Sequence, residues 1–270
     1  MAAHLTREKE IGIQIKSIAA ECGEHARVGY RVGLARSEDE IREAQRLRYK
    51  VFADELGARL ASRIPDHDID LYDPYCDHML VRETDSDRVV GTYRILSPIA
   101  ARRVGQYYSE SEFCITRLQH LRHRMVEVGR SCIHPDHRSG AVIAMLWAVL
   151  ANYMQSHGYD YLMGCASIGM GDGGHNAANL FRQIGPAHMA PVEYRVFPLH
   201  GLPVDSLATD QPALVPPLIK GYLRVGAWIC GEPAWDPDFN TADLLLLLPL
   251  SRMNQRYMRH FLKSADASAA

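Results

Sequence analysis

The sequence predicts a mixed α/β fold. Three observations lead to this prediction: a helix start signal at Ser37, two strand-like runs around a turn at 85–87, and a strand that runs through 134–140 into an apolar helix. Strands and helices that follow one another in this way form a sheet with helices packed on it. With 270 residues, 47% of them hydrophobic and 23% charged, the chain can bury the core of one large or two small domains.

The first predicted helix begins at a capping box. The Ser37 side chain can accept a hydrogen bond from the amide of Glu40, and the Glu40 carboxylate can reach back to the start of the helix. Arg48 and Phe52, four residues apart, share one face, and Gly57 marks the expected end. Apolar residues recur at helical spacing through this segment: Ile41, Ala44, Leu47, Val51 and Leu56.

Strand and helix patterns alternate through the middle of the chain. The first two strands flank Asp85-Ser86-Asp87, which is a turn signal, and therefore predict an antiparallel hairpin. The third strand leads through the turn at 134–140 directly into a helix. Strands are predicted at 78–82, 89–96, 125–133 and 159–166, and helices at 141–155 and 176–184.

The last third of the chain differs in composition. Residues 198–217 are rich in proline and small polar residues and predict a loop. Residues 238–248 end in five consecutive leucines, which is typical of a strand buried on both faces, and 251–262 predict a basic helix with methionine and aromatic residues. The expected organisation is an N-terminal segment at 1–27, a core domain at 28–197, and a loop with a C-terminal extension packing on the core at 198–270.

Charge and cysteine usage exclude several classes of protein. A formal net charge of -2 lacks the Lys and Arg excess of a nucleic-acid binder, so no nucleic-acid partner is expected. The six cysteines are scattered without a C-x-x-C pair, which favours reduced thiols and no metal site. Residues 1–29 lack the apolar run of a signal peptide, and no stretch approaches the roughly 20 apolar residues that span a bilayer. We therefore expect a cytoplasmic protein that is not integral to a membrane.

The strand, turn and helix around 125–155 offer a candidate anion site. The first amides of a helix are unpaired and lie at the positive end of its dipole, which favours phosphate. With Arg138 and Gly140 in the turn, the natural ligand is the phosphopantetheine arm of coenzyme A or of an acyl carrier protein. The alternative is an ordinary turn with a surface arginine.

Glu127 and Arg130 are the candidate catalytic pair on the third strand. Residues three apart on a strand point to opposite faces, unless a bulge at Gly129 turns both toward one pocket. A carboxylate in that pocket can take a proton from an attacking ammonium, which must become neutral to act as a nucleophile. The alternative is a structural ion pair or two exposed charges.

An acidic run lies between the first helix and the hairpin. Its carboxylates offer a site for the cationic part of a substrate, and the alternative is a solvated acidic loop. A calcium loop is excluded because the glycine and the closing glutamate of that motif are missing. The run comprises Asp66, Asp68, Asp70 and Asp73, with Asp77 close behind.

Ordered motifs give a family resemblance that covers roughly 28–262. Those at 48–52, 70–73, 91–94 and 127–130 resemble, in order, the signature positions of acyl-homoserine-lactone synthases, within the GCN5-related N-acyltransferase superfamily. They read Arg48-Tyr49-Lys50-Val51-Phe52, Asp70-Leu71-Tyr72-Asp73, Gly91-Thr92-Tyr93-Arg94 and Glu127-Val128-Gly129-Arg130. The segments 126–140, 216–222 and 236–248 more closely resemble the ornithine lipid synthesis N-acyltransferases, often labelled hemolysin-like.

The resemblance implies a fold, a reaction and a set of site residues. The fold is a central mixed, mostly antiparallel sheet flanked by helices, with a C-terminal extension. The reaction moves a 3-hydroxyacyl group from acyl carrier protein to the α-amine of ornithine and gives lyso-ornithine lipid. Carried over position by position, the implied roles are catalytic for Glu127, Arg130 and Arg94 and acceptor-binding for Arg48, Phe52, Asp70 and Asp73.

The donor is expected to enter as a thioester co-substrate, with no bound cofactor. The usual pyrophosphate loop of the superfamily appears here with a single glycine, which suits a carrier-protein donor better than compact coenzyme A. Direct attack on the thioester, with its carbonyl polarised by a backbone amide near Val128, predicts no acyl-enzyme. The expected phosphopantetheine site comprises Val128, Arg138, Ser139, Gly140, Ala141 and Val142.

Partners follow from the same reasoning. An acidic carrier protein can be steered by local basic surface, either Arg117, Arg122 and Arg124 or Arg252, Arg256 and Arg259. The helix at 251–262 can instead rest peripherally on the anionic inner membrane or pack on the core. Two rival functions stay open: another amine acyltransferase, such as a signal synthase or an enzyme that uses acyl-CoA or acetyl-CoA, and a non-enzymatic membrane-active protein.

Overall fold

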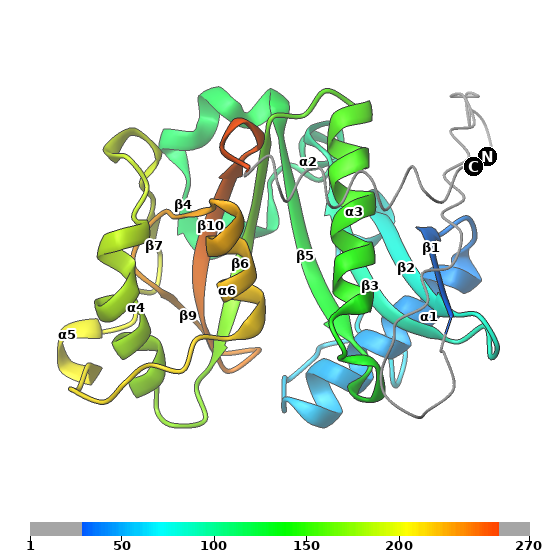
Figure 1. Cartoon of the computed structure of the whole chain (residues 1–270), viewed down its shortest axis with the longest axis horizontal. Helices are drawn as coiled ribbons and strands as arrows, with labels where there is room; N and C mark the ends of the chain where they lie inside the picture. Colours follow the sequence, from blue (N-terminus) through cyan, green and yellow to red (C-terminus); the bar gives the residue numbers. More distant parts are fainter. Residues whose placement is uncertain (1–28, 254–270) are drawn as a thin grey trace.

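A single central sheet organises the computed structural model, which describes residues 29–253 (Figure 1). Within these residues its strands follow the order β1-β2-β3-β5-β6-β10-β8, and β9 pairs with β10. All neighbours are antiparallel except β5 and β6. The strands are β1 (Tyr30–Leu34), β2 (Asp77–Glu83), β3 (Val89–Leu96), β5 (Met125–Ile133), β6 (Tyr161–Gly169), β8 (Trp228–Ile229), β9 (Ala234–Asp236) and β10 (Thr241–Pro249), while β4 (Phe113–Cys114) and β7 (Phe197–Pro198) form a separate pair. The predicted mixed, mostly antiparallel sheet is therefore confirmed.

Helices cover both faces of the sheet. One apolar core joins the sheet to α3, α4 and α6, and the opposite face packs on α1 and on the segment from α2 to η4. Figure 1 shows α3 and α6 on the near face. The helices are α1 (Glu38–Tyr49), α2 (Pro98–Val104), α3 (Ala141–Ser156), α4 (His175–His188), α5 (Val204–Leu207) and α6 (Pro217–Val225). Shorter helical turns are η1 (Lys50–Glu55, a π-helix), η2 (Asp73–Tyr75), η3 (Tyr108–Ser111), η4 (Thr116–Arg124), η5 (Pro135–His137), η6 (Val192–Tyr194) and η7 (Leu250–Arg252).

Local sequence signals placed the early elements well. Ser37 is the N-cap of α1 and accepts from the Glu40 amide at 3.3 Å, while Glu40 accepts from the amide of Arg36. The helix continues as η1 up to Glu55, and Gly57 follows in the left-handed region with φ 77°. The predicted hairpin forms as β2 and β3. The third predicted strand has the bounds of β5 and leads into α3.

The β5 and β6 strands separate soon after they meet. They pair only where Met125, Val126 and Glu127 lie opposite Tyr161, Leu162 and Met163. Beyond that point a Cβ atom on Gly164 would lie 2.3 Å from the carbonyl oxygen of Val128, so only glycine permits this close approach. Backbone N–H and C=O groups of a strand that have no neighbouring strand remain available to hydrogen-bond a ligand.

The C-terminal part completes the sheet. The strand β10 pairs antiparallel with β6 along its whole length, and its residues from Ala242 to Pro249 are buried, as the leucine run predicts. The segment expected to pack on the core as an extension thus also contributes strands to it. The predicted loop at 198–217 contains the short helix α5, and the predicted helix at 251–262 lies largely outside the described residues. None of the helices within 29–253 is both long and apolar enough to cross a bilayer.

Candidate active site

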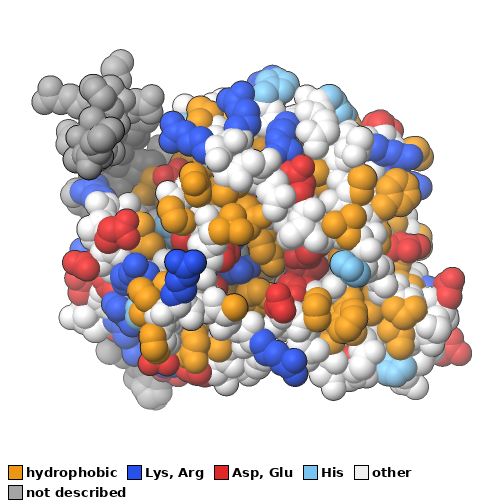
Figure 2. Space-filling view, turned by 180° about the vertical axis from the view of Figure 1, so that it is seen from behind, with side chains coloured by type: hydrophobic (Ala, Val, Ile, Leu, Met, Phe, Trp, Pro, Cys, Tyr) orange, Lys and Arg blue, Asp and Glu red, His pale blue; other side chains and the backbone are white. Residues whose placement is uncertain are grey.

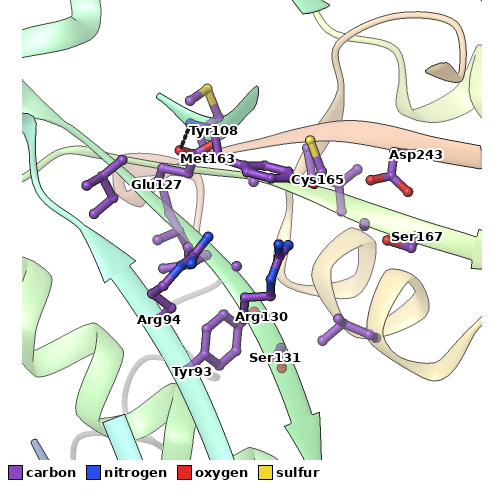
Figure 3. A pocket seen from close by; sticks show the side chains of 18 of the residues that line it. Tyr93, Arg94, Tyr108, Glu127, Arg130, Ser131, Met163, Cys165, Ser167 and Asp243 are labelled. Carbon is purple, nitrogen blue, oxygen red and sulfur yellow. Dashed lines mark hydrogen bonds between the residues drawn. The ribbon is translucent and has the colours of Figure 1, made fainter. Parts of the chain in front are cut away.

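A cavity of about 240 Å³ lies where β5 and β6 separate (Figure 3). Its walls come from β3, β5, β6, β10 and α6, with Phe52 and Leu56 at one side. It therefore sits at the opening of the sheet that the strand split creates. Residues on its walls include Arg94, Glu127, Val128, Arg130, Cys165, Ser167, Leu218, Tyr222, Asp236, Asp243 and Leu246.

The two faces of the sheet give this cavity two chemical characters. Alternate residues of a strand point to opposite faces. Leu162, Leu246 and Leu248 belong to the apolar core under α3 and α6. On the other face, Cys165 and Asp243 meet Glu127 and the η3 turn. The cavity thus joins an apolar side that suits an acyl chain to a polar side that suits an amine.

Glu127 is held in a buried hydrogen-bonded position on the polar side. Its carboxylate accepts from the amide of Tyr108 at 2.6 Å, from the amide of Ser109 at 2.8 Å and from the Ser109 hydroxyl. Burial raises the pKa of Glu127, and the hydrogen bonds from Ser109 and Tyr108 oppose that shift. A carboxylate with a raised pKa in a cavity is suited to accept a proton.

A bulge brings Arg130 to the same side as Glu127. Two residues of β5, Arg130 and Ser131, lie opposite the single residue Tyr93 of β3, and Arg130 takes a φ of 50°. The condition stated for the sequence motif is therefore met, since both side chains line one cavity. Figure 3 shows the side chains of Arg94 and Arg130 extending toward the side on which Glu127 and Cys165 lie.

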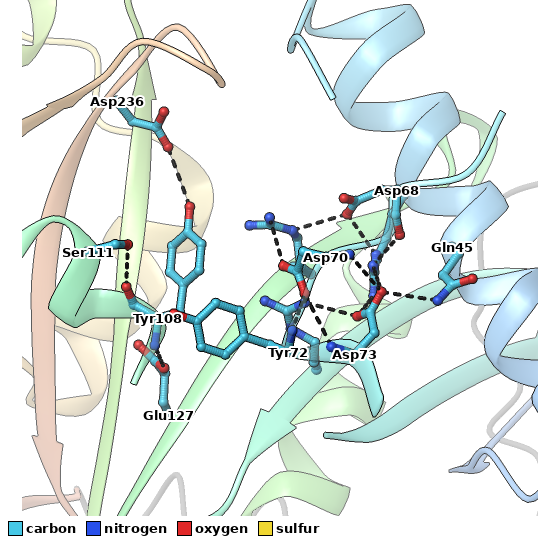
Figure 4. Close-up of polar contacts among 12 residues, drawn as sticks. Gln45, Asp68, Asp70, Tyr72, Asp73, Tyr108, Ser111, Glu127 and Asp236 are labelled. Atoms are coloured by element: carbon cyan, nitrogen blue, oxygen red, sulfur yellow. Dashed lines mark hydrogen bonds and ion pairs between the residues drawn. The ribbon is translucent and has the colours of Figure 1, made fainter. Parts of the chain in front are cut away.

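Three carboxylates of the acidic run, those of Asp68, Asp70 and Asp73, form a network with arginines from distant segments (Figure 4). Arg48 donates to Asp68 at 2.8 Å and to both carboxylate oxygens of Asp73 at 3.0 and 2.8 Å. Arg94 donates through Nη1 to Asp70 at 2.6 Å and to Asp73 at 2.9 Å. Nearby cations lower the pKa of Asp73 against its burial.

This network contains three of the four residues expected to contact the acceptor. The Arg48 side chain is fully buried, and Arg48 and Asp73 satisfy one another rather than lining the cavity. Asp70 likewise bonds to Arg94 and to Arg130, the latter at 3.2 Å. Their geometry makes these residues the support that holds the two cavity arginines in place.

Aromatic rings hold the Arg130 side chain in place. The Arg130 guanidinium lies 4.4 Å from the ring centroid of Phe239 and 5.0 Å from that of Tyr108. Phe52 contacts Phe239 edge to face and lines the cavity. Arg130 is thus held by stacking as well as by Asp68 and Asp70.

The expected phosphopantetheine residues divide between two places. Val128 lines the cavity, whereas the turn at 138–142 does not reach its wall. Arg138 forms a two-point ion pair with Glu55, at 2.6 and 2.7 Å, and Val142 is buried against Gly91. Gly140, with φ 92°, is the N-cap before Ala141, and Ser139 is exposed. The turn still presents the start of α3, but its arginine is already paired.

Several residues on the cavity wall or directly behind it carry no local sequence signal. Tyr108 and Ser109 belong to η3, and their amides hold Glu127. Asp243 stands within a strand of leucines, where an isolated acid in an apolar run is the one available clue. The residues that sequence reasoning missed are Tyr108, Ser109, Glu112, Cys165, Ser167, Asp236 and Asp243.

Comparison with known proteins finds N-acyltransferases among the relatives of this chain. A family model described as an Acetyltransferase (GNAT) domain matches residues 47–148. The chain is 36% identical over 260 residues to an L-ornithine N(alpha)-acyltransferase of Rhodobacter capsulatus, covering 89% of this chain and 98% of that protein. It is 38% identical over 246 residues to a protein of the same name from Agrobacterium fabrum, covering 84% and 83%.

Solved structures show the same fold at low sequence identity. The AHL synthase LasI aligns with a TM-score of 0.50 at 15% identity, over 87% of this chain and 96% of that one. MesI, a CoA-dependent acyl-homoserine lactone synthase, aligns with a TM-score of 0.51 at 14% identity, over 86% and 95%.

Proposed function

Because this chain belongs to the L-ornithine N(alpha)-acyltransferase family and is an acyltransferase, we propose that it acylates the α-amine of ornithine. The acyl group is a 3-hydroxyacyl chain, and acyl carrier protein delivers it as a phosphopantetheine thioester. The product is lyso-ornithine lipid. The observation that carries the proposal is the buried Glu127 beside the split between β5 and β6.

The cavity supports a direct transfer. Glu127 takes the proton of the ammonium, and the free amine attacks the thioester carbonyl. A backbone amide at the strand split stabilises the oxyanion of the tetrahedral intermediate. The intermediate then expels the thiolate, which takes up the second proton that the attacking nitrogen loses on becoming an amide. Burial raises the pKa of Cys165 well above its usual value, so this cavity thiol stays protonated and no acyl-enzyme is expected.

The cavity arginines supply a place for the α-carboxylate of the acceptor. Arg94 uses Nη1 for both of its ion pairs, and Arg130 uses Nε and Nη2. Both arginines line the cavity, and their side chains extend toward the side on which Glu127 lies (Figure 3). Two arginines held by buried aspartates form a rigid carboxylate receptor next to Glu127.

The turn before α3 favours a carrier protein as donor. Arg138, in the turn where a pyrophosphate would bind, is already paired with Glu55. The pyrophosphate of coenzyme A would therefore meet a carboxylate there instead of a free cation. Figure 2 shows basic and His side chains gathered along the upper edge of one face, which suits an acidic partner. Of the arginines expected to steer it, Arg122 is paired with Glu110 and Arg124 with Asp160, whereas Arg117 donates to a backbone carbonyl.

The test is a reconstituted transfer with purified protein. Ornithine is offered with 3-hydroxyacyl carrier protein or with the matching 3-hydroxyacyl-CoA, and lyso-ornithine lipid is measured by mass spectrometry. We expect product with the carrier-protein donor, little with the CoA donor, and a rate lower by about 100-fold or more with Glu127→Gln, while the exposed control Glu232→Gln stays active. Equal rates with both donors would overturn the carrier-protein assignment. Acylation of a different amine in place of ornithine would overturn the acceptor.

A further inference from the structure

A second group of acids lies at the far end of the polar side of the cavity. The carboxylate oxygens of Glu112 and Asp243 and the sulfur of Cys165 lie within 4.8 Å of one another. Asp236 lines the cavity together with Cys165 and Asp243, while Glu112 lies behind them, and Asp236 is close enough to raise the pKa of both Glu112 and Asp243. These three carboxyl groups form what we call the acidic end.

Glu112 meets another carboxyl group rather than a cation in this cluster. The residue is 8% exposed, its side chain contacts the Asp243 carboxyl and the Tyr108 hydroxyl, and within residues 29–253 no well-aligned donor reaches either of its carboxylate oxygens. Asp243 accepts from the Thr241 hydroxyl at 2.9 Å, and Asp236 from the amides of Asp238 and Phe239. In the part of the chain that the structure describes, Lys, Arg and His form no ion pair with any of the three.

Such a cluster is unfavourable without a cation. Burying carboxylates side by side is opposed by desolvation and by mutual repulsion, and each term favours the protonated form. Burial, with Asp243 and Asp236 nearby, raises the pKa of Glu112 far above the usual range of a carboxyl. A bound ammonium would supply the missing hydrogen-bond donors and the missing positive charge at once.

We propose that Asp243 and Glu112, with Asp236 beside them, bind the side-chain ammonium of the acceptor and select a dibasic amino acid. The inference rests on the proposed function and names the specificity site of the same cavity. The acidic end thus takes the cation-binding role expected of Asp70 and Asp73, whose carboxylates are occupied by Arg48, Arg94 and Arg130.

The spacing along the sheet fits a short diamine. Glu127 lies opposite Met163 on β6, and Cys165, which borders the acidic end, follows two residues later, about 6.6 Å away at the rise of a strand. The two nitrogens of extended ornithine are separated by five single bonds of about 1.5 Å, or about 6 Å end to end. The Ser109 hydroxyl bonds to Glu127 and lies 3.4 Å from the Cys165 sulfur. Ser109 therefore lies between Glu127 and the acidic end.

The η3 turn positions both ends of the acceptor in this arrangement. Tyr108 and Ser109 hold Glu127 at the amine to be acylated, and Glu112, which ends the turn, belongs to the acidic end. Tyr108 also reaches Asp236 through its hydroxyl at 3.5 Å (Figure 4). Anchoring the side-chain ammonium therefore leaves the α-amine, rather than the side-chain amine, beside Glu127.

The experiment compares ornithine with norvaline, which has the same carbon skeleton without the side-chain ammonium. Asp243→Asn and Glu112→Gln remove charge and preserve shape, and Asp238→Asn is the matched control because Asp238 is exposed on the neighbouring turn. We expect the ratio of kcat/KM for ornithine to that for norvaline to fall about 10- to 100-fold in the two test variants. The control should keep the wild-type ratio.

Binding measured without a donor separates this inference from the proposed function. Calorimetry should show ornithine binding to the wild-type protein and weaker binding to both test variants. Ornithine binding that is lost in Asp243→Asn, with no acylation of ornithine by the wild type, would leave the site standing and refute the function. Acylation of ornithine with an unchanged ratio in both variants would refute the site alone. Stoichiometric bound metal that disappears in Asp243→Asn, with ornithine binding unaffected, would also refute it.

Discussion

Replacing Glu127 with glutamine tests whether this carboxylate is the proton acceptor. Glutamine keeps the shape of the side chain but cannot accept the proton of the attacking ammonium. General base catalysis contributes about 100- to 10,000-fold in rate, so kcat should fall by that factor. The KM for ornithine should change little, because the arginines and the acidic end stay in place.

The same substitution has a calculable effect on stability. Both carboxylate oxygens of Glu127 accept from N–H or O–H donors, so one of these donors must face the new amide nitrogen. Leaving a buried donor unpaired costs about 1–3 kcal/mol. For a chain of this size that corresponds to a fall in Tm of about 2–12 °C. The kinetic comparison should therefore be made well below the Tm of the variant.

The pH profile distinguishes a catalytic role from a structural one. Burial raises the pKa of Glu127, and the active form is the deprotonated carboxylate. In the wild type at saturating ornithine, kcat should rise with pH through this raised pKa and level off above it. The glutamine variant should lack that limb. A variant that keeps the limb, or that keeps most of the wild-type kcat while folded, would refute the assignment of Glu127 as base.

Three further predictions concern the framework of the site. Gly164→Ala should lower kcat/KM more than 10-fold and destabilise the protein by about 1–3 kcal/mol, since the new Cβ would overlap the Val128 carbonyl; kinetics and thermal unfolding measure both, and an unchanged Tm would contradict the close approach. Asp73→Asn breaks the buried pairs to Arg48 and Arg94 and should cost about 3–5 kcal/mol in urea unfolding, so a loss below 1 kcal/mol would show that the network is not structural. Without acceptor, stability should fall between about pH 4.5 and pH 9, because folded Glu112 has a pKa raised to about 9 and holds a proton that the unfolded chain releases; Glu112→Gln should flatten this fall, and an equal slope in the variant would contradict it.

Local patterns were sufficient for the elements that set up the cavity. A capping box and a helical repeat located α1, and a turn flanked by apolar runs located the hairpin. The bulge could only be stated as a condition, because the left-handed φ falls on Arg130, whose side chain gives no local reason to adopt it. Its cause is the register with β3, which is a long-range property.

The roles of the acids depended on partners distant in sequence. Asp70 and Asp73 look like a cation site on their own, and only the folded chain brings Arg48 and Arg94 to them. Conversely, nothing near Glu112 in sequence indicates that β10 will place Asp243 beside it. Periodicity describes which face a residue occupies, but it does not say which strand lies next to it.

The position of β10 also bears on how the protein is made. Before β10 is synthesised, β6 is joined to the rest of the sheet by a short parallel contact with β5 and exposes an open, apolar edge. During translation this half of the sheet must wait until residue 249 has left the ribosome, some 80 residues after β6 itself. Nascent chains should therefore depend on chaperones over that interval, and premature termination between 169 and 241 should yield insoluble fragments rather than a weakened enzyme.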